Sequence, residues 1–159
     1  MRLAVAAAFL LAAAPAAAQP KPFDIAAFFT GPTHADNVIK IAFHAPHKLV
    51  VDSVGHVEGK QFIQLDTVHE EGKPVSTRKW VTHQLSPGHY AGTLSDATGP
   101  VDITVAGNTT TIKYTMQGGL SVVQTMQLQA DGRSLSNSAI ARKFGIKFAT
   151  VQGTIRKLD

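Results

Sequence analysis

Short alternating segments separated by turn signals recur along most of the sequence, and this rhythm constrains the fold more than any other feature. Between Trp80 and Gly99, one alternating segment leads to the turn signal Ser86-Pro87-Gly88, and a second surrounds Tyr90 before a turn at Asp96–Gly99. Two short strands that flank a Pro-Gly turn form a hairpin. The same spacing predicts strands over Val38–Phe43, Leu49–Val57, Lys60–His69, Val75–Leu85, His89–Ser95, Val101–Val105, Thr109–Gln117, Leu120–Gln129, Leu135–Arg142 and Ile146–Lys157.

This series of strands with short turns predicts an all-β fold, a barrel or a sandwich, in which antiparallel neighbours form a meander. In one segment Leu120, Val122 and Met126 share a face, and Ile112, Tyr114 and Met116 share a face in another. One apolar and one polar face is typical of an antiparallel sheet around a core. A small barrel can be filled by side chains or hold one small ligand, and the pattern leaves both open.

A different period precedes the strands. Phe23-Asp24-Ile25-Ala26-Ala27-Phe28-Phe29 places apolar residues at helical spacing and is followed by Thr30-Gly31-Pro32. This predicts one or two helical turns whose aromatic face plugs the fold, ended by the glycine and proline.

The first residues have the order of a secretory signal peptide. Arg2 is followed by an apolar run from Leu3 to Ala14 and by the small residues Ala16-Ala17-Ala18. We expect cleavage after Ala18, a periplasmic location, and a mature part, residues 19–159, that forms a single domain. No later segment is long and apolar enough for a transmembrane helix.

Composition removes several classes of function. The chain has no cysteine, which excludes disulfides, thiol chemistry, zinc–cysteine sites and a lipid-anchored cysteine. Its 15 basic residues exceed its 11 acidic ones only slightly, and the basic residues are dispersed. We therefore expect no nucleic-acid partner, whereas peripheral contact with an anionic membrane surface stays open.

No constellation of residues predicts an active site or a metal site. The seven histidines are scattered, and the closest pair, His44 and His47, is separated by a proline. We expect these histidines on the surface, and no metal or cofactor. Asp66 and Asp102 fall within strands, where an aspartate most often lies on the wet face.

Aromatic residues offer the best candidates for a ligand pocket. Packed core and pocket wall draw on the same residue types, so the two interpretations stay equal at this stage. The candidates are Trp80, Tyr90, Phe62, Tyr114, Phe144 and Phe148.

Several motifs resemble the domain-of-unknown-function family 3833 (DUF3833). They are Arg78-Lys79-Trp80, the run from Gly88 to Gly99, Ala106-Gly107-Asn108, Tyr114, and the segment from Leu135 to Gly145. The resemblance implies a bacterial envelope protein with a lipocalin-like (calycin-type) β-barrel and no established activity. The chain departs from the family by lacking the lipid-anchor cysteine, by having Gln124-Thr125-Met126 in place of an acidic-Trp-Met segment, and by having Ser138 after Asn137.

Three functions follow, in order of preference. The first is binding or carriage of a small apolar or amphipathic, lipid-like ligand, with Trp80, Tyr90 and Tyr114 as cavity walls and Asn137 and Lys143 as polar or closing groups. The second is an envelope interaction module with a packed barrel. The third, an enzyme acting on a lipid-like substrate, requires a histidine or carboxylate that faces the interior.

Overall fold

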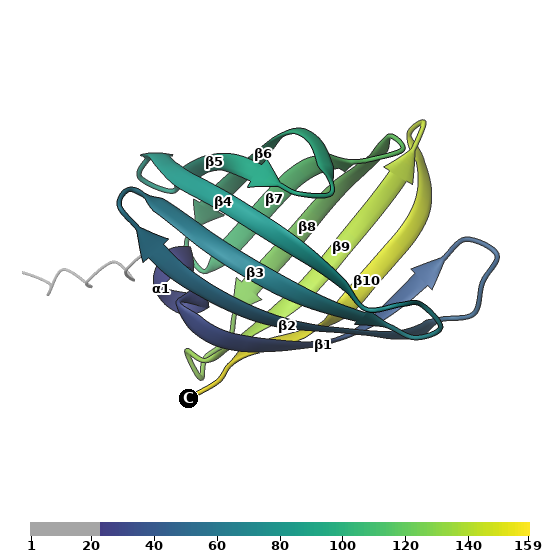
Figure 1. Ribbon diagram of the computed structural model, residues 1–159, viewed down its shortest axis with the longest axis horizontal. Coiled ribbons are helices and arrows are strands. Elements are labelled where there is room, and N and C mark those ends of the chain that lie inside the picture. The colour runs from purple at the N-terminus through teal and green to yellow at the C-terminus, as the bar shows by residue number, and fades with distance from the viewer. Residues whose placement is uncertain (1–22) are drawn as a thin grey trace, which may run out of the picture.

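In the computed structural model, which describes residues 23–159, ten antiparallel strands follow one short helix (Figure 1). The helix α1 covers Ile25–Phe29. The strands are β1 (Gly31–Ile41), β2 (His47–Glu58), β3 (Gln61–Glu70), β4 (Ser76–Ser86), β5 (His89–Leu94), β6 (Ala97–Ala106), β7 (Thr109–Met116), β8 (Leu120–Leu128), β9 (Ser134–Lys143) and β10 (Ile146–Lys157). The predicted signal peptide, residues 1–18, lies outside the described residues and stays a prediction.

Each strand pairs with its neighbours in sequence, and β1 also pairs with β10, so the meander closes into a barrel. Closure leaves every strand hydrogen-bonded on both sides, which removes the exposed edges of an open sheet. The predicted fold, an all-β meander that closes into a lipocalin-like barrel with a helical plug, is confirmed. We call the end that carries α1 and the β2–β3 and β4–β5 loops the plug end. The opposite end, with the β1–β2 and β9–β10 loops, is the distal end (Figure 1).

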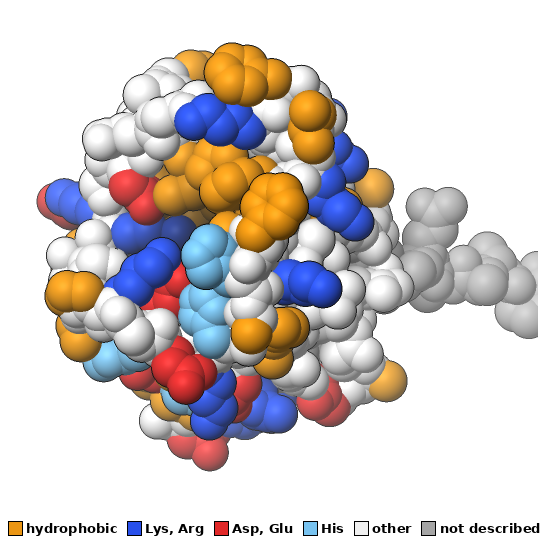
Figure 2. Space-filling model, turned by 90° about the vertical axis from the view of Figure 1, so that its right-hand side faces the viewer, with side chains coloured by type: hydrophobic (Ala, Val, Ile, Leu, Met, Phe, Trp, Pro, Cys, Tyr) orange, Lys and Arg blue, Asp and Glu red, His pale blue; other side chains and the backbone are white. Residues whose placement is uncertain are grey.

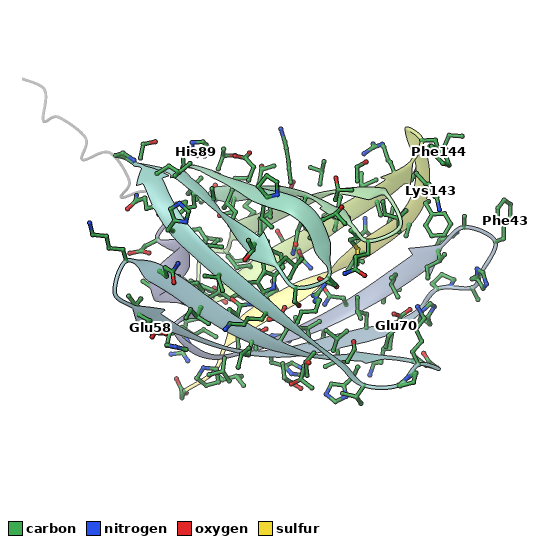
Figure 3. All side chains as sticks on the ribbon, turned by 45° about the horizontal axis from the view of Figure 1, so that its top comes forward. Phe43, Glu58, Glu70, His89, Lys143 and Phe144 are labelled. Carbon is green, nitrogen blue, oxygen red and sulfur yellow. The ribbon has the colours of Figure 1, made fainter. Side chains whose placement is uncertain are left out.

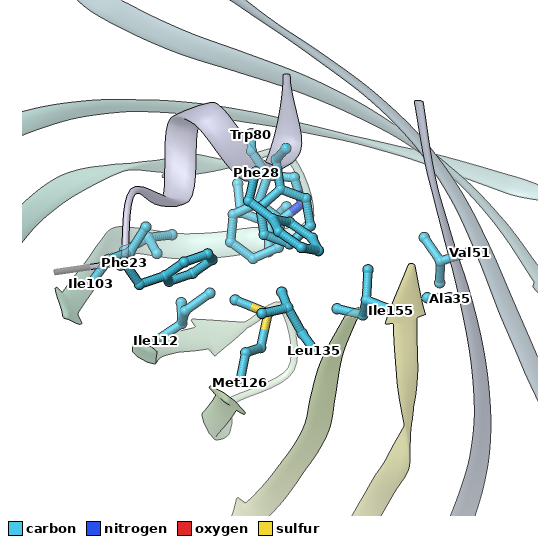
Figure 4. Packing of buried hydrophobic residues seen from close by; sticks show 13 residues of the cluster. Phe23, Phe28, Ala35, Val51, Trp80, Ile103, Ile112, Met126, Leu135 and Ile155 are labelled. Carbon is cyan, nitrogen blue, oxygen red and sulfur yellow. The ribbon is translucent and has the colours of Figure 1, made fainter. Parts of the chain in front are cut away.

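The plug is built by local chemistry. Asp24 caps α1 by accepting a hydrogen bond from the Ala27 amide at 3.0 Å. At the other end, the Lys157 ammonium donates to the carbonyls of Ala27 at 2.7 Å and Phe28 at 3.1 Å, which would otherwise lack partners. Phe23, Phe28 and Phe29 are buried and stack edge to face, as the aromatic spacing predicted (Figure 4).

Gly55 explains how the plug approaches the wall so closely. A Cβ atom at this position would lie 2.2 Å from the carbonyl oxygen of Phe29 and 2.5 Å from the ring of Phe62. Only glycine permits the bridge between Thr30 and Gly55 that joins the end of α1 to β2.

The first strand begins earlier than predicted. The sequence predicted a strand from Val38, but β1 starts at Gly31, and Thr33, Ala35 and Asn37 point inward. Two of these three are polar, so the inner face has little hydrophobic signal. Pro32 is tolerated because the register of β1 with β10 begins one residue later, at Thr33. The ladder therefore does not need an N–H group from position 32.

The turn predicted at Asp96–Gly99 is partly wrong as well. β6 already begins at Ala97, and its register with β7 shifts between Thr98 and Asp102. Gly99, with φ of 78°, lies in this irregular segment. A β-bulge and a turn contain the same types of residue. The sequence of one strand therefore does not distinguish them, because a bulge is defined by its pairing with the partner strand.

A histidine–carboxylate pair links β2 to β3 at the distal end. His47 Nε2 lies 2.8 Å from Glu70 Oε1, and Lys73 Nζ lies 2.9 Å from the same oxygen. The hydrogen bond to Glu70 raises the pKa of His47 above its ordinary value of 6.5. Burial raises the pKa of Glu70, but the hydrogen bonds from His47 and Lys73 outweigh it and leave that pKa below 4.5.

We expect this pair to make stability pH-dependent. His47 stabilises the fold fully below pH 6.5 and loses this contribution as the pH rises through its raised pKa. Glu70 contributes above pH 4.5 and loses its contribution as the pH falls. The native chain should therefore unfold at a higher temperature than the His47→Gln variant, and this difference in unfolding temperature should be larger at about pH 6 than at about pH 9. A difference that is equal at both values contradicts the assignment.

Candidate functional site

The barrel contains a cavity of about 630 Å³. Its lining extends from Leu49 and Arg78, near the distal ends of β2 and β4, to the plug end, where α1 and the β2–β3 and β4–β5 loops form a rim. Rim residues are Asp24, Ile25, Gly59, Lys60, Pro87 and Gly88. This volume lies within the range of sites for small molecules, so the barrel is hollow rather than packed solid.

One wall of the cavity carries a row of polar side chains on neighbouring strands. Ser53, Asp66 and Arg78 are directly paired across β2, β3 and β4. Asp66 Oδ1 accepts from Ser53 Oγ at 2.8 Å and from Gln64 Nε2 at 2.7 Å. Asp66 Oδ2 accepts from Trp80 Nε1 at 2.8 Å and from Arg78 at 3.5 Å. We call Ser53, Gln64, Asp66, Arg78 and Trp80 the carboxylate cluster.

Asp66 has the environment that a buried charge requires. Only 3% of its surface is exposed, and the four donors occupy the acceptor capacity of its two oxygens. The expectation that Asp66 faces water is therefore wrong, whereas Asp102 does lie at the surface, 2.7 Å from His89. A strand aspartate is exposed or buried according to its register, and the residue type alone does not reveal this.

Trp80, Tyr114 and Arg78 form one corner of the cavity. The Trp80 and Tyr114 rings meet edge to face with centroids 5.7 Å apart, a favourable aromatic geometry. Burial raises the pKa of the Tyr114 hydroxyl above its ordinary value of 10.0, although the positive charge of Arg78 opposes this shift. The hydroxyl therefore keeps its proton near neutral pH and can donate a hydrogen bond. Arg78 Nε is buried and has no acceptor among residues 23–159.

A second polar row, which we call the amide row, lies on β8, β9 and β1. Gln124 Nε2 donates to Asn137 Oδ1 at 2.8 Å, and Asn137 Nδ2 donates to Asn37 Oδ1 at 2.9 Å. Asn37 Nδ2 continues the chain to the Leu49 carbonyl at 3.3 Å. Buried amides joined in this way satisfy one another while still facing the cavity.

Gly153 makes the amide row possible. It lies on β10, between Asn37 on β1 and Asn137 on β9, and is paired with both. A Cβ atom on Gly153 would lie 2.5 Å from Asn37 Oδ1. The absence of a side chain lets the two asparagines reach each other across the intervening strand.

Four of the five predicted site residues line the cavity, namely Trp80, Tyr90, Tyr114 and Asn137. Phe62, another aromatic candidate, lines it too. Lys143 does not, because it is exposed at the distal end of β9, beside the turn to β10. Phe144 and Phe148 are also outside the cavity, and Phe144 is almost completely exposed.

Sequence reasoning did not identify Asn37, Gln64, Arg78 and Gln124 as cavity residues, and it placed Asp66 outside. Alternation was the available signal, since Gln124 shares the inward parity of Val122 and Met126. A polar residue at an inward position interrupts the hydrophobic pattern, so it is easily assigned to a loop or a solvated face.

The described residues hold no group of three histidine, aspartate or glutamate side chains that could bind a metal ion. Within the same part of the chain, no helix has the length and hydrophobicity needed to cross a membrane. Aromatic side chains and hydrogen-bond donors and acceptors together line the cavity.

Three solved structures share this fold. The S-type phycobiliprotein lyase CPES from Guillardia theta has a TM-score of 0.67 at 7% identity, over 84% of this chain and 90% of that chain. Rv2717c from M. tuberculosis has a TM-score of 0.59 at 13% identity, over 83% and 94% of the two chains. A DUF3598 family protein of unknown function from Nostoc punctiforme has a TM-score of 0.59 at 9% identity, over 91% of this chain and 53% of that chain. At these identities the likeness shows the fold alone.

No curated protein matches this sequence. A family profile does: that of the protein of unknown function DUF3833 matches residues 5–157, which include α1 and all ten strands. The chain therefore belongs to the DUF3833 family.

Proposed function

We propose that this protein binds and carries a small amphipathic, lipid-like molecule inside the barrel. The observation that carries the proposal is a cavity of about 630 Å³ whose lining combines apolar and aromatic side chains with two ordered polar rows. Such a lining suits a ligand with an apolar body and a few hydrogen-bonding groups. The lyase from Guillardia theta shares the barrel, which supports a binding role by analogy of fold.

The charges of the lining favour a ligand without net charge. Asp24 and Asp66 contribute two carboxylates, and Lys60 and Arg78 contribute two cations. A charged ligand would meet no surplus of the opposite sign, so a neutral polar group is better matched. Its acceptor can take a hydrogen bond from the hydroxyl of Tyr114, which lines the cavity.

Asp66 is unsuited to act as a general base. Asp66 is the buried carboxylate at the cavity wall, and all its acceptor positions are used by protein donors. A general base needs a free lone pair within hydrogen-bond distance of the proton that it abstracts. The carboxylate cluster is therefore a rigid wall that positions Trp80 and Arg78.

Export to the periplasm remains part of the proposal, on the order of residues in the first eighteen positions. Contact with a membrane surface, the second partner that the sequence left open, is argued below from the distal end.

Native mass spectrometry of the protein purified from the periplasm of its native cells tests both the carriage of a ligand and the export of the chain. We expect a protein mass that begins at Gln19 and a second species heavier by one neutral lipid-like molecule. Collisional activation should release that molecule intact. An apoprotein that also fails to bind the neutral apolar probe N-phenyl-1-naphthylamine would contradict carriage, and an uncleaved chain would contradict export.

A further inference from the structure

Two loop tips at the distal end present phenylalanine to solvent. Phe43, in the β1–β2 loop, is 105% exposed, and Phe144, in the β9–β10 turn, is 91% exposed. Figure 3 shows both at the distal end, directed away from the body of the barrel. The β1–β2 loop lies beside the start of β10, because the Ala42 amide donates to the Phe148 carbonyl at 2.8 Å. A phenylalanine side chain that is exposed in this way buries no apolar surface in the fold.

Both phenylalanines also occupy an unfavourable backbone conformation. Among the described residues they alone combine a side chain with positive φ, 65° at Phe43 and 50° at Phe144. Phe144 and Gly145 form the two-residue turn between Lys143 and Ile146, where Asn-Gly is the preferred pair. Phe43 is the third residue of a turn closed by the His44 amide and the Ile41 carbonyl, where glycine or asparagine is preferred.

Neither burial nor backbone geometry therefore explains an aromatic residue at either tip. Strain of this kind is typical of positions that serve a function. Because both rings point outward, that function involves something outside the chain.

Basic side chains surround the tips. Six of them lie on the distal ends of the strands or in the distal loops: Lys40, Lys48, Lys73, Arg142, Lys143 and Lys147. The acidic residues at this end are Glu70, Glu71 and Asp96. Glu70 pairs with His47 and Lys73, which also uses the charge of Lys73, and Asp96 lies 4.0 Å from Arg78. Five basic side chains then remain beside Glu71. Figure 2, an end-on view, shows hydrophobic and basic side chains on this face, together with histidine and acidic side chains.

We propose that the distal end docks onto an anionic lipid bilayer, with Phe43 and Phe144 inserted at the interface. Aromatic rings among lysines and arginines match a membrane surface, since the rings enter the boundary of headgroups and acyl chains while the cations contact phosphate. Lys143 Nζ lies 5.9 Å from the centre of the Phe144 ring, so one tip holds both elements. Two protruding tips suit a deformable surface better than a flat protein partner. Neither Phe43 nor Phe144 lines the cavity, so the docking tips are separate from the ligand site.

Co-sedimentation with vesicles of phosphatidylcholine, with or without phosphatidylglycerol, tests the proposal. We expect the native chain to bind the anionic vesicles and to release them as salt is added. The variant Phe43→Asn/Phe144→Asn should bind on the order of tenfold or more weakly. Its unfolding temperature should be equal or higher, because asparagine suits both turns. This combination separates loss of docking from loss of folding.

A matched control removes two exposed apolar residues from the side wall instead. Val54→Thr/Leu65→Thr should leave vesicle binding unchanged, because these residues lie on β2 and β3 away from the tips. The proposal is overturned if the native chain ignores anionic vesicles or if the asparagine variant binds them as the native chain does. The proposal is also overturned if the native chain self-associates without vesicles and the asparagine variant does not, since the tips would then contact a second copy of the chain.

Discussion

Replacing Asp66 with asparagine is expected to lower the free energy of unfolding by about 3 kcal/mol, the scale for breaking a buried charge pair. Asp66 accepts from Ser53, Gln64, Trp80 and Arg78, and all four partners are donors. The amide of asparagine is uncharged and brings its own donors to this position, so Ser53 or Gln64 must rearrange to accept from it, and Arg78 loses its nearer carboxylate. Chemical denaturation followed by the fluorescence of Trp80, the only tryptophan, measures the change.

The sequence supplies a matched control. Asp102 is also an aspartate within a strand, but its side chain is half-exposed and hydrogen-bonds to His89 at the surface. Asp102→Asn should change the free energy of unfolding by less than about 0.5 kcal/mol, as is usual for surface substitutions. Equal effects of the two substitutions would show that the carboxylate cluster does not stabilise the barrel.

Filling the cavity should abolish most ligand binding without unfolding the protein. Ala139 on β9 lines the cavity, and its small side chain leaves space in front of the amide row. We expect Ala139→Trp to weaken the binding of N-phenyl-1-naphthylamine on the order of tenfold or more, about 1.4 kcal/mol. The indole takes up space that is otherwise empty, so the unfolding temperature should change little. Fluorescence titration of the probe measures the affinity.

Its control lies one residue away. Ser138 precedes Ala139 on the same strand, and alternation directs its side chain to the outer surface, where it is exposed. Ser138→Trp introduces the same group into the same strand and should leave probe affinity within about twofold of the native value. Weakening by both substitutions would mean that the probe binds outside the barrel.

Most of the architecture could be predicted because its causes are local. Turn residues and period-two alternation depend only on neighbours in sequence, so each observed strand overlaps a predicted one. The misplaced starts of β1 and β6 have the same explanation. Thr33 and Asn37 face inward although they are polar, and Gly99 belongs to a bulge that only the pairing with β7 defines.

The binding site was predicted only in part. Trp80, Tyr90 and Tyr114 were found as large aromatic residues in strands, and all three line the cavity. Phe144 has the same chemistry and lies outside, because a position in a turn decides its exposure. Asp66 and Arg78 were not recognised as a pair, since they are twelve residues apart and meet only through the register of β3 and β4.

The sequence by itself thus determined the class of fold, the plug of aromatic residues and the aromatic part of the cavity lining, because these follow from local periodicity and residue type. Only the tertiary structure decided that the barrel is hollow, that Asp66 is buried among donors, and that Asn37 and Asn137 meet across Gly153. The physical reason is closure: register around a closed barrel determines which polar side chains face each other, and register depends on all strands together.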